Sequence, residues 1–106
     1  MKTTRLSGFL LGLVLLAPGC GGPTQEAREN RRELDAILTA ITIRNSRLLE
    51  DDAGRIKARR DAGQLTDEEY RGMEAVINKA RAGDWAGAER DGYEFRNKHP
   101  FVREGQ

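Results

Sequence analysis

Residues 65–70, with the sequence LTDEEY, carry the clearest local folding signal in this 106-residue chain. A Thr followed three residues later by a Glu forms a capping box, in which the Thr66 hydroxyl and the Glu69 carboxylate each accept a hydrogen bond from a backbone amide at the start of a helix. Leu65 and Tyr70 occupy the two positions whose apolar side chains pack together across such a start. The motif therefore predicts a helix that begins at Thr66.

The same region also resembles the second half of a calcium-binding EF-hand loop. Gly63 would stand at the sixth position of that loop and Glu69 at the twelfth. The first, third and fifth positions would then be Ala58, Arg60 and Ala62, and none of them offers an oxygen ligand from its side chain. We therefore interpret the segment as a helix start and expect no metal site there.

Two short helices are predicted downstream. The first runs from the capping box to Gly83, a residue type that favours the left-handed conformation found just after a helix end. The second starts after Asp84, a good N-cap, and ends at His99-Pro100. Because their connection is short, we expect the two helices to lie antiparallel. The residues expected to face the core are Tyr70, Met73, Val76, Ile77, Ala80, Trp85, Ala88 and Phe95, with Tyr93 as a further candidate.

Upstream, apolar residues spaced by three and four predict one long helix from about Thr24 to about Arg60. Its apolar positions are Leu34, Ile37, Leu38, Ile41, Leu48, Leu49 and Ile56. The predicted fold class is all-α, with this long N-terminal helix packed on the shorter antiparallel hairpin in a three-helix arrangement. Asn45 and Asp52 interrupt the apolar stripe, and we expect them to mark where a partner, a second copy or water meets the long helix.

The first residues have the organisation of a secretory signal. Lys2 and Arg5 precede an apolar run over residues 6–17. That run is shorter than the roughly 20 residues that a membrane-spanning helix needs. The sequence therefore predicts export of the protein.

The end of the run, residues 16–20 (LAPGC), resembles the lipobox of bacterial lipoproteins. The resemblance implies cleavage after Gly19 and a lipid on Cys20, which becomes the new N-terminus. Pro18 stands where the family usually carries a small or aliphatic residue. One alternative is an ordinary signal peptide cut nearby, with Cys20 left as a free thiol. Another is a cytosolic protein with an apolar N-terminal helix.

The lipoprotein interpretation divides the chain into four parts. These are a signal peptide at 1–19, the lipidated cysteine and a short linker at 20–25, a helical domain at 26–100 and a flexible tail at 101–106. Gly21 follows the cysteine, whereas Asp in that position favours retention in the inner membrane among Gram-negative members. The resemblance thus implies anchoring in the cell envelope, in the outer rather than the inner membrane.

Composition argues against several classes of function. The chain has 18 Lys and Arg against 17 Asp and Glu, so it has no basic excess for binding nucleic acid. One Cys excludes an internal disulfide and a Cys-cluster zinc site, and one His excludes the HExxH type of metal site. Ser46 lacks a nucleophile-elbow motif. We therefore expect no enzymatic activity, no cofactor, no nucleic-acid partner and no small-molecule substrate.

A second resemblance covers Glu69 to Pro100. Gly83-Asp84-Trp85, Ala88 and Pro100 are similar to the second half of a tetratricopeptide repeat, whereas Gly92 and Phe95 depart from its pattern. The resemblance implies binding of a protein or peptide. A generic helical hairpin is the alternative, because such repeats normally need about three copies to be stable.

Two functional hypotheses follow. The preferred one is a small membrane-anchored lipoprotein of the cell envelope with a non-catalytic binding or structural role, held by the lipid on Cys20 and engaged with a protein partner or a second copy. The alternative is a periplasmic inhibitor or immunity-type protein that binds one enzyme through Trp85, Tyr93 or Phe101. For Trp85 we favour a core position.

Overall fold

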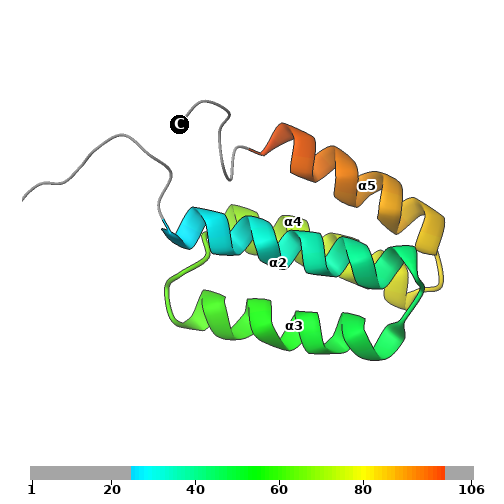
Figure 1. Ribbon diagram of the computed structural model, residues 1–106, viewed down its shortest axis with the longest axis horizontal. Helices are drawn as coiled ribbons and strands as arrows, with labels where there is room; N and C mark the ends of the chain where they lie inside the picture. The colour runs from blue at the N-terminus through cyan, green and yellow to red at the C-terminus, as the bar shows by residue number, and fades with distance from the viewer. Residues whose placement is uncertain (1–24, 100–106) are drawn as a thin grey trace, which may run out of the picture.

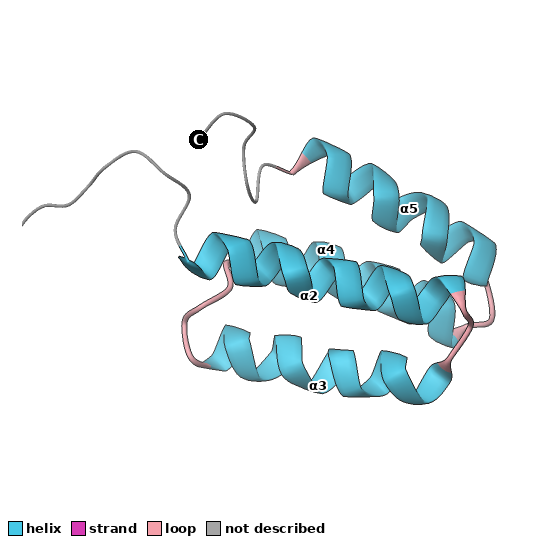
Figure 2. Ribbon diagram, in the orientation of Figure 1, coloured by secondary structure: helices cyan, strands magenta, loops and turns pink. Residues whose placement is uncertain are grey.

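The computed structural model describes residues 25–99, which form four α-helices and no strand. The helices are α2 (Gln25–Thr42), α3 (Ser46–Asp61), α4 (Asp67–Arg81) and α5 (Trp85–Lys98) (Figure 1). Figure 2 shows them joined by short loops. The all-α prediction is confirmed. The predicted signal peptide, Cys20 and the C-terminal tail lie outside the described residues.

The prediction of one long first helix is wrong, and so is the three-helix arrangement built on it. The chain turns at Ile43, Arg44 and Asn45, where Arg44 takes a left-handed φ of 54°. The Asn45 amide donates to the Ala40 carbonyl at 2.8 Å, which closes the end of α2. The Asn45 side chain then accepts a hydrogen bond from the Leu48 amide at 3.0 Å and caps α3. Asn45, which we expected to mark where a partner, a second copy or water meets the long helix, is therefore the N-cap of the additional helix α3.

The four helices form an antiparallel up-and-down bundle. α2 and α4 lie one behind the other in the middle, and α3 and α5 lie on opposite sides of them (Figure 1). α2 packs against each of the other three helices. Because the number of helices is even, the start of α2 and the end of α5 lie at the same end of the bundle, together with the loop from α3 to α4 (Figure 1).

The hydrophobic core draws on all four helices and on the loop before α4. Its buried members are Leu34, Ile37, Leu38, Ala40, Ile41, Leu49, Ile56, Leu65, Met73, Val76, Ile77, Ala80 and Ala88. Tyr70, Trp85 and Phe95 are half-buried and pack against this set. Leu48 was predicted to lie in the apolar stripe, but its side chain is exposed because α3 begins a new register after the turn.

The capping box at the start of α4 is confirmed. The Glu69 amide donates to Thr66 Oγ1 at 3.1 Å, and the Thr66 amide donates to Glu69 Oε1 at 2.9 Å. Gly83 has a left-handed φ of 93°, and Asp84 caps α5 by accepting a hydrogen bond from the Gly87 amide at 2.9 Å. These local signals set the α4–α5 hairpin as the sequence predicts.

Candidate functional site

A hollow of about 340 Å³ lies between α2 and α5, and we call it the α2–α5 groove. Its lining residues are Asp35, Leu38, Thr39, Thr42, Ile43, Tyr93 and Arg96. Two of them expose large apolar side chains: Ile43 is 57% exposed and Tyr93 is 41% exposed. Single exposed apolar residues are common on protein surfaces, whereas these two line the same hollow, which makes it a candidate contact site.

Polar contacts between the two helices hold the groove in shape. Arg96 Nε lies 3.2 Å from Asp35 Oδ1, and Thr42 Oγ1 donates to Glu89 Oε2 at 3.1 Å. One contact involves the middle of α2 and the other its last residue, so α2 and α5 are linked at two separated points. The groove is therefore part of the folded framework of the bundle.

Three arginines extend this surface toward the start of α2. Arg28, Arg31 and Arg32 line a shallow hollow of about 280 Å³ together with Asp35, which also lines the α2–α5 groove. We call these three residues the arginine face of α2. The positive face and the apolar groove therefore meet at Asp35 on one side of the molecule.

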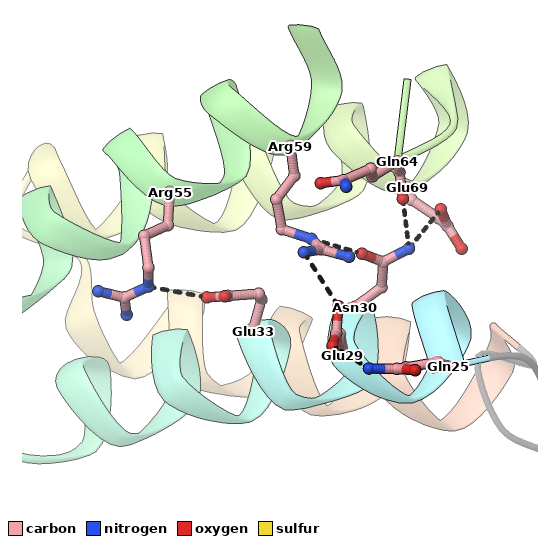
Figure 3. Close-up of polar contacts among 8 residues, drawn as sticks. All are labelled: Gln25, Glu29, Asn30, Glu33, Arg55, Arg59, Gln64 and Glu69. Carbon is pink, nitrogen blue, oxygen red and sulfur yellow. Dashed lines mark hydrogen bonds and ion pairs between the residues drawn. The ribbon is translucent and has the colours of Figure 1, made fainter. Parts of the chain in front are cut away.

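Two acidic residues of α2, Glu29 and Glu33, turn toward α3 instead. Glu33 Oε1 lies 3.0 Å from Arg55 Nε, and Glu29 Oε1 lies 3.4 Å from Arg59 Nη1 (Figure 3). These two ion pairs use the carboxylates between α2 and α3. Glu29 and Glu33 are thus paired away from the arginine face, whereas Asp35 lies beside that face and is paired with Arg96.

A buried polar cluster joins the helices at the end of the bundle where the chain enters α2 (Figure 3). Asn30 is 3% exposed; its Nδ2 donates to the Gln64 carbonyl at 2.9 Å and reaches Glu69 Oε1 at 3.5 Å. Asn30 Oδ1 accepts from Arg59 Nε at 2.9 Å. The amide therefore ties α2 to α3 and to the capping box of α4, which is a structural role.

Asp52 is buried within the bundle, at 3% exposure. Its Oδ1 accepts from the Arg55 guanidinium, and its Oδ2 is buried with no hydrogen-bond partner among the described residues. Burial raises the pKa of this carboxyl, and the charge of Arg55 opposes that rise. Asp52 faces the interior, so it does not mark an exposed contact position on α3.

A larger hollow of about 560 Å³ lies between α3 and α4, with Ile56 and Ile77 among its lining residues. Polar side chains close its two ends. At one end Arg81 binds Glu50 through two hydrogen bonds of 2.7 and 2.8 Å, which hold the pKa of Glu50 below its usual value. At the other end the Arg60 guanidinium lies 4.2 Å from the centroid of the Tyr70 ring.

The tyrosine at that end also donates from its hydroxyl to Glu74 at 3.1 Å. Burial and this hydrogen bond raise the pKa of Tyr70. Both ends of the α3–α4 hollow are thus occupied by side chains that already form ion pairs, hydrogen bonds or a cation–π contact with one another. The α2–α5 groove, with its exposed apolar side chains, is the better candidate for a contact site.

The aromatic residues proposed as anchors have different surroundings. Trp85 is half-buried against the core, as expected. Tyr93 is exposed at the α2–α5 groove, so its prediction as a further core residue is wrong. Phe101 lies outside the described residues. The sequence analysis missed Ile43, although its spacing gave a signal: it follows Ile41 by two residues and so falls off the apolar stripe.

Within residues 25–99, no group of three or more His, Cys, Asp or Glu side chains is arranged to hold a metal ion. No helix in that part of the chain is both long and apolar enough to cross a membrane. No protein-family model matches the chain, and neither a curated protein nor a solved structure shows significant similarity to it.

Proposed function

We propose that the protein is a small lipoprotein, anchored in the cell envelope by a lipid on Cys20, whose helical bundle binds a protein partner without catalysing a reaction. The observation that supports binding is the exposure of Ile43 and Tyr93 on one groove. Full burial of an exposed apolar side chain contributes about 1.5–3 kcal/mol, and covering these two partly exposed residues would contribute roughly half of that for each. Tyrosine is also one of the residue types enriched at binding hot spots.

The anchor and the apolar end of the groove would lie at opposite ends of α2. Cys20 stands five residues before Gln25, and five extended residues span at most about 17 Å. A lipid on that cysteine would hold the first turn of α2 close to the bilayer. Ile43 follows the last residue of α2, and this 18-residue helix is about 27 Å long. When the bundle stands upright on its anchor, the apolar end of the groove would face away from the membrane, toward other envelope proteins.

The anchor is tested by the intact mass and membrane partitioning of the native protein beside Cys20→Ala. Gly22→Ala, which keeps the cysteine, serves as the matched control. We expect a product that begins at residue 20, carries the mass of attached lipid and sediments with membranes. Cys20→Ala should lose both the added mass and the membrane association. An unmodified product cut at another residue would refute the anchor.

A second candidate function is a freely diffusing periplasmic inhibitor or immunity-type protein. The exposure of Tyr93 favours it too, because that residue was a proposed anchor for an enzyme partner. The mass measurement separates the two functions. A soluble product without lipid that still binds a partner through Tyr93 would support the inhibitor, whereas a lipidated product would support the anchored binder.

A further inference from the structure

We infer that the partner of the α2–α5 groove is an acidic amphipathic helix. Its apolar side chains would contact Ile43 and Tyr93, and its carboxylates would face Arg28, Arg31 and Arg32. This inference rests on the proposed function and specifies the chemistry of the partner.

Charge supplies the first argument. The arginine face and the groove form one continuous surface, because Asp35 lines both hollows. Asp35 is itself engaged by Arg96, and the nearby carboxylates Glu29 and Glu33 pair with α3. The surface is therefore positive at its α2 N-terminal end, in a chain whose charges otherwise nearly cancel. Complementary charge steers a partner toward such a surface and fixes its orientation.

Shape supplies the second argument. The surface follows α2 from the arginine face near its start to Ile43 beyond its end, and α5 borders it along the groove. Arg28 and Ile43 are fifteen residues apart, which corresponds to about 22 Å along a helix. A partner helix of about four turns has that length, and amphipathic helices commonly bind in apolar grooves.

A membrane surface fits these observations less well than a protein does. Anionic headgroups match the arginine face, but a bilayer that held Cys20 would lie near the start of α2. With the bundle upright on that tether, Tyr93 beside the middle of the groove and Ile43 at its far end would lie away from the bilayer. A partner that contacts both ends of the surface accounts for all five residues.

The test is photo-crosslinking from the full-length protein in the cells that make it. A photoreactive amino acid replaces Ile43 or Tyr93, and a matched control carries it at Asp51, which is exposed on α3. Sequencing of the crosslinked peptides identifies the segment that is in contact. We expect crosslinks from positions 43 and 93 to one protein segment with helical apolar spacing and excess Asp and Glu, and none to it from position 51.

Charge reversal tests the arginine face within the same experiment. Arg28→Glu with Arg32→Glu changes two exposed side chains, and Arg71→Glu, on exposed α4 surface, is the matched control. We expect the crosslinks from position 43 to be lost with the double reversal and kept with the control. Circular dichroism of each purified variant checks that the helices remain folded.

Several results would overturn the inference while leaving a protein-binding function intact. These are crosslinks from position 43 to a neutral or basic segment or to a second copy of this chain, and crosslinks to a partner from position 51 alone. Crosslinks to lipid from positions 43 and 93 would mean that the groove rests on the bilayer. The absence of a protein crosslink from all three positions would refute the proposed binding function itself.

Discussion

Gly92 of α5 lies directly against Leu38 of α2: a Cβ atom built on the glycine would stand 2.5 Å from Leu38 Cδ2 and 3.3 Å from Val76 Cγ1. Leu38 and Val76 are both buried in the core. Because a single methyl group has no room there, the absence of a side chain at position 92 sets how closely α5 approaches the rest of the bundle.

Gly92→Ala is therefore expected to destabilise the bundle, although alanine favours helix formation. Overpacking of a core typically costs about 1–3 kcal/mol, which outweighs the roughly 1 kcal/mol gained in helix propensity. Gly54→Ala is the matched control, since nothing lies within 4 Å of its new Cβ, and it should be stabilising. Urea unfolding of the two variants measures the difference, and a Gly92→Ala variant as stable as Gly54→Ala would show that Leu38 has room to move.

Asn45→Ala should lower the free energy of unfolding by about 1 kcal/mol, because it removes the acceptor that caps α3. Asn45→Asp keeps an acceptor in the same place and should be close to the wild type. Thermal unfolding followed by circular dichroism would compare the three proteins. Equal melting temperatures for Asn45→Ala and the wild type would mean that the cap contributes nothing to stability.

Asn30→Ala should lower the free energy of unfolding by about 1–3 kcal/mol, more than Asn45→Ala does. The substitution leaves buried polar partners such as Arg59 Nε and the Gln64 carbonyl without their hydrogen bonds to Asn30. Gln25→Ala removes an exposed hydrogen bond to Glu29 from the same helix and should change stability by less than about 0.5 kcal/mol. Denaturant titration of both variants gives the comparison. If Asn30→Ala lowered the free energy of unfolding as little as Gln25→Ala does, water would have replaced the Asn30 amide.

Asp52 should make the bundle less stable as the pH rises out of the acidic range. Its pKa is raised above 3.8 in the folded protein, so folding favours the neutral carboxylic acid. The stability that this preference provides is fully present below pH 3.8 and is lost as the pH rises through the folded pKa. Asp52→Asn should therefore be more stable than the wild type at pH 7, and the difference should shrink as the pH falls to 3.8.

Unfolding of the two proteins across this pH range measures the effect, with Asp51→Asn on exposed surface as the control. A lower stability of Asp52→Asn at pH 7 would show that the ion pair with Arg55 outweighs the cost of burying the charge.

Some helix ends can be predicted from the sequence more clearly than others. Thr66, Glu69 and Gly83 have residue types that act through local backbone chemistry, so the sequence predicts the bounds of α4 well. The turn between α2 and α3 has neither Gly nor Pro, and Arg44 takes a positive φ that its residue type rarely adopts. The apolar spacing continues on both sides of this turn, which explains why one long helix was predicted.

The candidate site could be predicted only in part, for a related reason. The sequence singles out Tyr93 as a possible contact residue, but Ile43 becomes its neighbour only when α5 folds back along α2. That arrangement depends on Gly92 and Leu38, which lie 54 positions apart in the sequence and meet through tertiary packing. Local patterns give little information about such a contact, so the groove emerges only from the folded bundle.

The common position of the two ends of the bundle, residues 25 and 99, makes the fold a candidate for circular permutation. A linker could join these ends, and new termini could be opened in the turn at 43–45, without changing the order of helices around the core. The same geometry guides the attachment of labels. A fluorophore or affinity tag joined after residue 99 would leave the bundle at the end where α2 begins, whereas one inserted in the 43–45 turn would stand beside the α2–α5 groove and would block a partner that binds there.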